Sequence, residues 1–278
     1  MKDRFLISEV STVGPGTTEF VVEAPRVAAH AHPGQFVIVR PTVGSERIPL
    51  TICDFDAEVG TITLVVQAVG RTTTEMQDLG AGEHLADVLG PLGAPTEIDR
   101  FGTCVVVAGG VGVAIALPVA RALTAAGNEV IGVLGARTTE QVILRSAFEQ
   151  ACRELAITTE DGSVGTKGFV TDALLRILDH RSIDRVFAVG PIAMMRAVSE
   201  MTRDRQVPTI ASLNPIMVDG TGMCGGCRVS VGGDTRFACV DGPEFDAHLV
   251  DFDSLERRNT AYRAFESCQL QIAEASHG

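Results

Sequence analysis

The stretch of sequence that most constrains the fold is an apolar run at residues 103–108, Thr-Cys-Val-Val-Val-Ala, which Gly109-Gly110-Val111-Gly112 follows. An apolar run without alternation is typical of a strand in a parallel sheet that is buried on both faces. Residues 114–126 have the composition of a helix, and a second apolar run comes next at 129–135. Strands that alternate with helices predict a doubly wound α/β domain, which we place at residues 99–212.

The rest of this α/β domain continues the alternation. The expected elements are helices at residues 141–153, 171–178 and 192–203 and a strand at 185–189. Residues 1–98 differ, because short β-branched and aromatic runs at 20–23, 36–39 and 61–66 are separated by turns that contain Gly and Pro. Short strands at regular spacing predict a closed β-barrel, and a helical patch is expected at 73–79.

The charge of the chain excludes some classes of function. Its 278 residues include 23 Lys and Arg against 35 Asp and Glu, which gives a net charge of −12. A bare nucleic-acid-binding surface is expected to be basic, and anionic membranes also attract basic surfaces. No apolar run reaches the roughly 18 residues that a membrane-spanning helix requires. The N-terminal sequence MKDRFLISEV carries charges where a signal peptide requires apolar residues, so we expect a cytoplasmic protein.

Residues 213–278 do not continue the alternation of strands and helices, and they contain a cluster of cysteines. Cys224 and Cys227 form a C-x2-C pair, and Cys239 follows after 11 intervening residues. In a reducing compartment such clusters bind metal more often than they form disulfides. Metal ligation would stabilise a segment with little apolar content, which we expect to end in an amphipathic helix at 253–273.

Two kinds of metal centre fit this spacing. A zinc knuckle would take a fourth Cys or His ligand, and the nearest histidine is His248. A plant-type [2Fe–2S] loop has the spacing C-x4-C-x2-C…C, which places its first ligand at Asp219 when it is counted back from Cys224. The segment then has the pattern D-x4-C-x2-C-x11-C. Glycines within it favour the iron–sulfur loop, because backbone N–H groups there can hydrogen-bond to cluster sulfurs.

The loop Gly109–Gly112 lies between an expected strand and an expected helix, where a dinucleotide pyrophosphate meets helix N–H groups. The pattern G-x-G-x-x-G is incomplete, because Ile115 stands at its third glycine, so a plain strand-to-helix turn stays open. No clear acidic residue ends the second strand, where Gly135-Ala136-Arg137 stands instead. Arg137 would suit a 2′-phosphate, but an exposed loop arginine explains it equally well, and the choice between NAD and NADP stays open.

Two segments of the expected barrel have the chemistry that a flavin requires. The sequence Pro33-Gly34-Gln35-Phe36-Val37 is a turn that opens a strand, and Arg47-Ile48-Pro49-Leu50-Thr51 places a cation, an extended segment and a hydroxyl in a row. A cation can lie near flavin phosphates and a hydroxyl near the flavin ring. Two ordinary barrel strands with turns are the alternative.

Taken in order, these motifs resemble one known family. The sequence contains PGQFV at 33–37, RIPLT at 47–51, GPLG at 90–93 and AGGVGVA at 108–114, followed by GAR, DGS, GP-x-x-MM and D-x4-C-x2-C-x11-C. Nearly the whole chain resembles the ferredoxin-NADP reductase superfamily, in its branch with a C-terminal [2Fe–2S] module. That branch includes the electron-transfer subunit of dihydroorotate dehydrogenase.

The resemblance implies a β-barrel that binds FAD, a Rossmann-like domain that binds NAD(H), with NADP(H) not excluded, and a [2Fe–2S] module at residues 213–278. The residues implied for FAD are Arg47, Pro49, Leu50, Thr51, Val66, Gln67, Gly70, Thr72 and Thr73, with Thr51 near the flavin ring as the candidate catalytic residue. Those implied for the nicotinamide nucleotide are Gly109, Gly110, Gly112, Arg137, Asp161, Gly190 and Pro191. The implied cluster ligands are Asp219, Cys224, Cys227 and Cys239.

Three of these positions depart from patterns within the superfamily. Arg47 stands one residue before the usual arginine, and Leu50 replaces the usual aromatic residue. Asp219 replaces a cysteine of the orotate branch, which has four, and resembles the three-cysteine, one-aspartate cluster of the ferredoxin:NADP branch.

The resemblance implies an oxidoreductase subunit that moves electrons between NAD(H), FAD and a [2Fe–2S] cluster. Its expected partner is a larger, NADP-binding flavin and iron–sulfur subunit of a ferredoxin:NADP oxidoreductase complex, through which ferredoxin would be reached. Two alternatives stay open. One is the electron-transfer subunit of dihydroorotate dehydrogenase, and the other, from a different class, is a non-catalytic redox-sensing or zinc-stabilised binding module.

Overall fold

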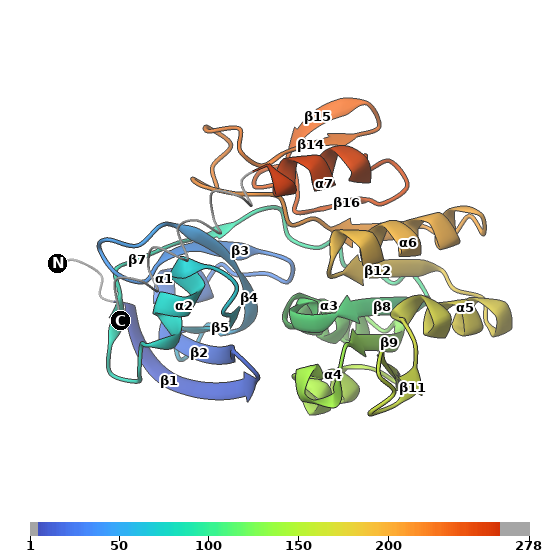
Figure 1. Cartoon of the computed structure of the whole chain (residues 1–278), viewed down its shortest axis with the longest axis horizontal. Helices are drawn as coiled ribbons and strands as arrows, with labels where there is room; N and C mark the ends of the chain where they lie inside the picture. Colours follow the sequence, from blue (N-terminus) through green and yellow to red (C-terminus); the bar gives the residue numbers. More distant parts are fainter. Residues whose placement is uncertain (1–4, 262–278) are drawn as a thin grey trace.

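A computed structural model describes residues 5–261 of the chain as a barrel beside an α/β layer, with a small C-terminal module along one edge (Figure 1). The barrel is a seven-stranded antiparallel sheet in the order β6-β1-β2-β5-β4-β3-β7. Its strands are β1 (Phe5–Gly14), β2 (Thr17–Glu23), β3 (Phe36–Arg40), β4 (Ile48–Asp56), β5 (Thr61–Gln67), β6 (His84–Leu85) and β7 (Asp87–Leu92), with short helices α1 (Pro25–Ala28) and α2 (Arg71–Gln77).

The alternation of buried and partly exposed side chains in β2 and in the first half of β5 favours the barrel. In these segments Phe20, Val22, Ile62 and Leu64 are fully buried, whereas Val21 and Thr63 between them are partly exposed. An antiparallel sheet with one buried face has this period of two. The β-barrel prediction is therefore confirmed.

The second sheet has the order β11-β10-β9-β8-β12-β13-β16, and all its neighbours pair in parallel except β13 and β16. Its strands are β8 (Thr103–Gly109), β9 (Glu129–Ala136), β10 (Glu154–Thr159), β11 (Thr166–Lys167), β12 (Arg185–Val189), β13 (Thr209–Ser212) and β16 (Glu244–Asp246). The helices are α3 (Val113–Ala125), α4 (Arg145–Ala151), α5 (Val170–His180) and α6 (Ile192–Arg203), with short 3-10 turns η1 (Gly110–Gly112) and η2 (Thr139–Gln141). The prediction of an α/β domain with a parallel sheet is confirmed.

The helix expected at 141–153 is wrong in its extent. Only Arg145–Ala151 is α-helical, because η2 precedes it and Leu144 adopts a left-handed conformation with φ of 51°. A left-handed residue cannot belong to a right-handed helix. The helix therefore starts four residues later than its composition suggests.

The C-terminal module contains the hairpin β14 (Arg228–Val231) and β15 (Asp234–Phe237) and helix α7 (Phe252–Thr260). The expected helix at 253–273 is confirmed as far as Thr260, and the remainder lies outside the described residues. Because β16 pairs with β13, this module extends the α/β sheet by one antiparallel strand. No helix within residues 5–261 has the length and apolar character needed to cross a membrane.

Barrel, linker and C-terminal module meet at one junction. The Gln35 side chain donates to the Gly93 carbonyl at 2.8 Å, and the Ala94 N–H donates to the Gly242 carbonyl at 2.7 Å. The Thr96 hydroxyl donates to a carboxylate oxygen of Glu244 at 2.9 Å. Burial raises the pKa of Glu244 from its ordinary 4.5 to about 7, although the hydrogen bond from Thr96 opposes the shift. The junction therefore favours a protonated Glu244.

We expect this carboxyl to make folding stability fall as pH rises from about 4.5 to about 7, since the unfolded chain releases the proton first. At pH 8 the cost is up to about 3 kcal/mol, from 1.36 kcal/mol per pKa unit. Glu244→Gln keeps an acceptor for Thr96 and should melt at a higher temperature than wild type at pH 8 but not at pH 4.5. Glu58→Gln, at an exposed position in a turn of the barrel, is the control. Equal pH dependence in wild type and Glu244→Gln would contradict the assignment.

Candidate functional site

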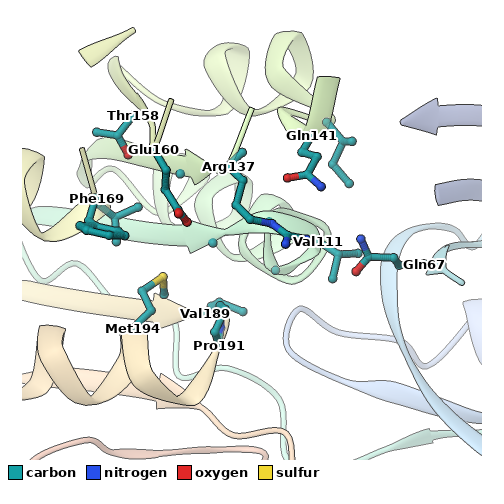
Figure 2. Close-up of a pocket in the computed structure, with 18 of the residues that line it drawn as sticks. Gln67, Val111, Arg137, Gln141, Thr158, Glu160, Phe169, Val189, Pro191 and Met194 are labelled. Carbon is teal, nitrogen blue, oxygen red and sulfur yellow. The ribbon is translucent and has the colours of Figure 1, made fainter. Parts of the chain in front are cut away.

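The main cavity, of about 600 Å³, opens at the carboxyl ends of the parallel strands, where open α/β sheets bind ligands. Figure 2 shows side chains from both halves of the molecule directed into it. One wall comes from the ends of β8, β9, β10 and β12, and Pro15, Thr17 and Gln67 of the barrel close the opposite side. The cavity therefore lies between the two units and not within either alone.

The glycine loop after β8 forms one wall of this cavity. A Cβ at Gly112 would lie 2.6 Å from the Val189 carbonyl oxygen, and one at Gly109 would lie 2.6 Å from the Met194 sulfur. Gly110 has a φ of +55°, which a side chain would strain. Only glycines let the ends of β8 and β12 come this close, and α3 then begins at Val113 with its free N–H groups at the cavity. This cradle fits a dinucleotide pyrophosphate.

The predicted nucleotide residues divide into two groups. The cavity is lined by Gly109, Gly110, Gly112, Arg137, Gly190 and Pro191, all six from the prediction. Asp161 is not among the described residues that line it, because its carboxylate accepts hydrogen bonds from the Ser163 N–H at 3.0 Å and the Ser163 hydroxyl at 2.7 Å. These bonds lower the pKa of Asp161 and hold it in a turn.

Among the lining residues that sequence reasoning missed, Glu160 and Phe169 have side chains suited to ligand contact. Glu160 comes directly after β10, and its carboxylate points into the cavity beside the β9 end (Figure 2). Phe169 lies at the start of α5 with 61% of its surface exposed, an unusual setting for a large aromatic residue. The sequence analysis expected an acidic residue after the second strand of the α/β domain, whereas Glu160 follows the third strand of that domain, β10. Its place directly after a strand was the signal that could have identified it.

The predicted flavin residues lie on neighbouring barrel elements. In the β3–β4 ladder Thr51 pairs with Phe36 and Pro49 pairs with Ile38. The Thr73 hydroxyl accepts from the N–H groups of Val69 at 3.0 Å and Gly70 at 2.9 Å, so it caps α2. A flavin role for Thr73 must therefore be compatible with this cap.

The remaining flavin residues occupy several places. Leu50 is on β4, Val66 and Gln67 end β5, and Thr72 is buried in α2. Gln67 reaches the main cavity, whereas Arg47 lines a second one, of about 540 Å³, together with Arg40, Asp219 and Thr221. Arg47 therefore lies in a cavity that the cysteine loop also lines.

The cysteine loop is folded around its predicted ligands. The buried Cys227 and Cys239 sulfurs lie 3.1 Å apart, and Cys224 is exposed. One Asp219 oxygen accepts the Thr221 N–H at 2.8 Å and the other accepts the Cys224 N–H at 2.6 Å, which lowers the pKa of Asp219. Within the described part of the chain, no three candidate side chains converge as a closed metal site.

The donor chemistry nevertheless fits an iron–sulfur cluster. The Gly226 N–H donates to the Cys224 sulfur at 3.4 Å, as loop amides do to cluster sulfurs. Burial raises the pKa of Cys239 to about 12, so this thiol holds its proton until a metal replaces it. Three sulfurs and one carboxylate from Asp219, Cys224, Cys227 and Cys239 would complete the site.

Within residues 5–261, the alternatives to Asp219 as fourth ligand are engaged elsewhere. The His248 Nε2 lies 3.0 Å from the Thr202 hydroxyl on α6, and Cys53 and Cys104 are buried in apolar cores. Cys152 packs against the same core as Cys104. Cys268 lies outside the described residues. Among the described candidates, Asp219 is the one with a hydrogen bond to the cysteine loop, because its carboxylate accepts the Cys224 N–H.

Comparison with known proteins gives two domain matches. The oxidoreductase NAD-binding domain matches residues 106–200, and the iron–sulfur cluster binding domain of dihydroorotate dehydrogenase B matches residues 214–251. A homologue of the dihydroorotate dehydrogenase B (NAD(+)) electron transfer subunit from Thermotoga maritima is 47% identical over 253 residues, covering 91% of this chain and 89% of the relative. The corresponding subunit from Bacillus caldolyticus is 34% identical over 260 residues, covering 90% and 98%.

A solved structure of NADH-dependent reduced ferredoxin-NADP oxidoreductase, studied for flavin-based electron bifurcation, has a TM-score of 0.92 at 43% identity. The alignment covers 98% of both chains. These likenesses confirm the predicted architecture, the oxidoreductase class and the cofactors FAD, NAD(H) and iron–sulfur. They also support a partner subunit, because the relatives are electron-transfer subunits. The roles of individual site residues stay predictions.

Proposed function

Because the chain belongs to the family of dihydroorotate dehydrogenase electron-transfer subunits and their homologues, we propose that it carries electrons from NADH to a larger flavin and iron–sulfur subunit. The main observation is the cavity that Gln67 of the barrel shares with the glycine loop, where a nicotinamide and a flavin could meet. FAD, when bound, links the two-electron chemistry of NADH to the one-electron chemistry of a [2Fe–2S] cluster.

The residues of the chain hold and orient these groups. In this proposal Gly109, Gly110 and Gly112 receive the nucleotide pyrophosphate, and Thr51 places a hydroxyl near the flavin ring. Arg47 supplies positive charge at the second cavity, which Asp219 of the cysteine loop also lines. The flavin segment and the cluster loop thus meet across one cavity, which suits a short electron path.

The partner that we favour is the NADP-binding subunit of a ferredoxin:NADP oxidoreductase, with ferredoxin reached through that complex. Asp219 supports it over the orotate enzyme, whose branch has a cysteine at this position. Around the exposed Cys224, the side chains of Val218, Met223 and Val240 are 54%, 89% and 51% exposed. This apolar rim is where we place the partner. The six described cysteines are all free thiols, which is compatible with the cytoplasmic location that we propose.

The proposal is tested by the spectrum and partner of the purified protein. We expect flavin absorbance near 450 nm together with iron–sulfur absorbance, and bleaching of both by anaerobic NADH. The protein should co-purify with a larger flavin and iron–sulfur subunit, and the complex should reduce NADP with NADH and reduced ferredoxin. A colourless protein that contains zinc would contradict the proposal. Co-purification with a dihydroorotate-oxidising subunit would favour the orotate alternative.

We also propose that the cavity prefers NADH to NADPH. The Glu160 carboxylate can accept hydrogen bonds from ribose hydroxyls and would repel a 2′-phosphate, although Arg137 lines the same cavity. In Glu160→Gln the ratio of kcat/KM for NADH to kcat/KM for NADPH should therefore decrease about tenfold, which corresponds to about 1.4 kcal/mol. Asp161→Asn, one residue further and outside the cavity, is the control. An unchanged ratio in Glu160→Gln would contradict this role.

A further inference from the structure

Helix α7 packs against the buried side of the cysteine loop. Phe252 and Leu255 on its inner face are buried in the same apolar cluster as Cys227 and Cys239. The helix begins at Asp251, whose carboxylate accepts the Ser254 N–H at 2.9 Å. The N-terminal half of the helix is therefore fixed both by packing and by an N-cap.

The α/β domain holds α7 from its other side. Arg196 of α6 lies 2.9 Å from both the Asp253 and the Glu256 carboxylates. The Asn259 side chain donates to the Asn214 carbonyl at 2.9 Å, and Asn214 lines the main cavity. The helix thus spans the distance between the nucleotide cavity and the cysteine loop.

Arg258 on this helix contacts the cysteine loop itself. Its guanidinium donates to the Gly226 carbonyl at 3.1 Å. The backbone N–H of Gly226 in turn donates to the Cys224 sulfur at 3.4 Å. Gly226 lies between the two cysteines of the C-x2-C pair, so this bond fixes the turn that aims an amide at a ligand sulfur. Among residues 5–261, no carboxylate forms an ion pair with Arg258, whereas Arg196 has two.

We propose that Arg258 is a positioning residue of the iron–sulfur centre, which holds the C-x2-C turn and raises the reduction potential of the cluster. The turn role follows from the bond to Gly226. The effect on the reduction potential follows from charge, because reduction adds one negative charge to the cluster and a nearby guanidinium charge favours the reduced form. The inference rests on the proposed ligands of the cluster.

The test measures the midpoint potential and the rate of cluster loss in the whole chain. Arg258→Gln keeps an N–H donor but removes the charge, so the equilibrium constant for cluster reduction should fall about tenfold, a shift of about 59 mV to lower potential. Arg258→Lys keeps the charge and should retain the wild-type potential. Arg258→Met loses both features and should also lose its cluster faster in air.

The matched control is Arg257→Gln, which removes the same charge from the adjacent, exposed position of the same helix. It should leave potential and cluster content at wild-type values. The inference is overturned if Arg258→Gln has the wild-type potential, if Arg257→Gln shifts it equally, or if Arg258→Lys shifts it as Arg258→Gln does. A wild-type chain without a [2Fe–2S] spectrum would instead overturn the proposed ligand set.

Discussion

Asp219→Ala should leave the protein folded but with a labile cluster, which is lost at least about tenfold faster than from wild type. Substituting residues that only support metal ligands typically lowers metal affinity or activity ten- to a hundredfold. Loss of a ligand itself should therefore weaken cluster binding at least as much. The motivation is the D-x4-C-x2-C-x11-C spacing, together with a loop in which Asp219 already stands within hydrogen-bond distance of the Cys224 backbone. The measurement is visible circular dichroism of the cluster over time, with iron content as the second readout.

Two further variants separate a ligand role from a turn role at this position. Asp219→Asn keeps an oxygen that can accept the Thr221 and Cys224 N–H groups but removes the carboxylate charge. Asp219→Cys removes the hydrogen bonds and supplies a thiolate. If Asp219 is a ligand, the cysteine variant should hold a cluster with an all-thiolate spectrum and shifted potential, and the asparagine variant should be labile. If Asp219 only shapes the turn, the order of stability should be reversed.

A control for lost turn geometry is available in the same module. Asp241 accepts the Phe237 N–H at 2.7 Å and is exposed, as a turn-forming carboxylate. Asp241→Ala should therefore keep its cluster. A result in which Asp219→Ala retains a normal spectrum while His248→Ala loses the cluster would assign the fourth ligand to the histidine.

The sequence predicted those features that local chemistry determines. The strand at 103–108 was predictable because a continuous apolar run must be buried on both faces. The cysteine loop was predictable because ligand spacing is a local property. The predicted start of the helix at residue 141 was wrong, because the left-handed conformation of Leu144 is a backbone feature that no residue type signals.

The features that sequence reasoning missed arise from tertiary contacts. Glu160 becomes a cavity residue only because β10 ends beside β9, and its neighbour Asp161 turns toward Ser163 instead. Arg258 stands 32 residues from Gly226, and its contact depends on how α7 packs. A pairing between β13 and β16 likewise had no signal, because a strand of three residues carries too little pattern.

The second large effect is expected in the nucleotide cavity. Gly112→Val should weaken NADH binding at least about 100-fold, or about 2.8 kcal/mol at 1.4 kcal/mol per tenfold. A Cβ there would lie 2.6 Å from the Val189 carbonyl oxygen and 3.0 Å from its carbon, so backbone atoms must move. Since β12 and the glycine loop form opposing parts of the pyrophosphate cradle, this shift displaces the N–H groups that should bind the ligand. A misplacement of about 1 Å in an active site can reduce catalysis about 100-fold, and we expect a comparable effect on binding here.

FAD content is the readout that makes the Gly112 experiment specific, because the predicted flavin residues lie on the barrel and the substitution lies on the α/β sheet. We expect Gly112→Val to retain wild-type flavin absorbance and to be reduced by dithionite, while NADH titration shows weakened binding. Gly80→Val is the matched control, since a Cβ at Gly80 meets only the end of the Glu83 side chain, at 3.7 Å. Loss of FAD with intact NADH binding would mean that the two cofactors are assigned to the wrong units.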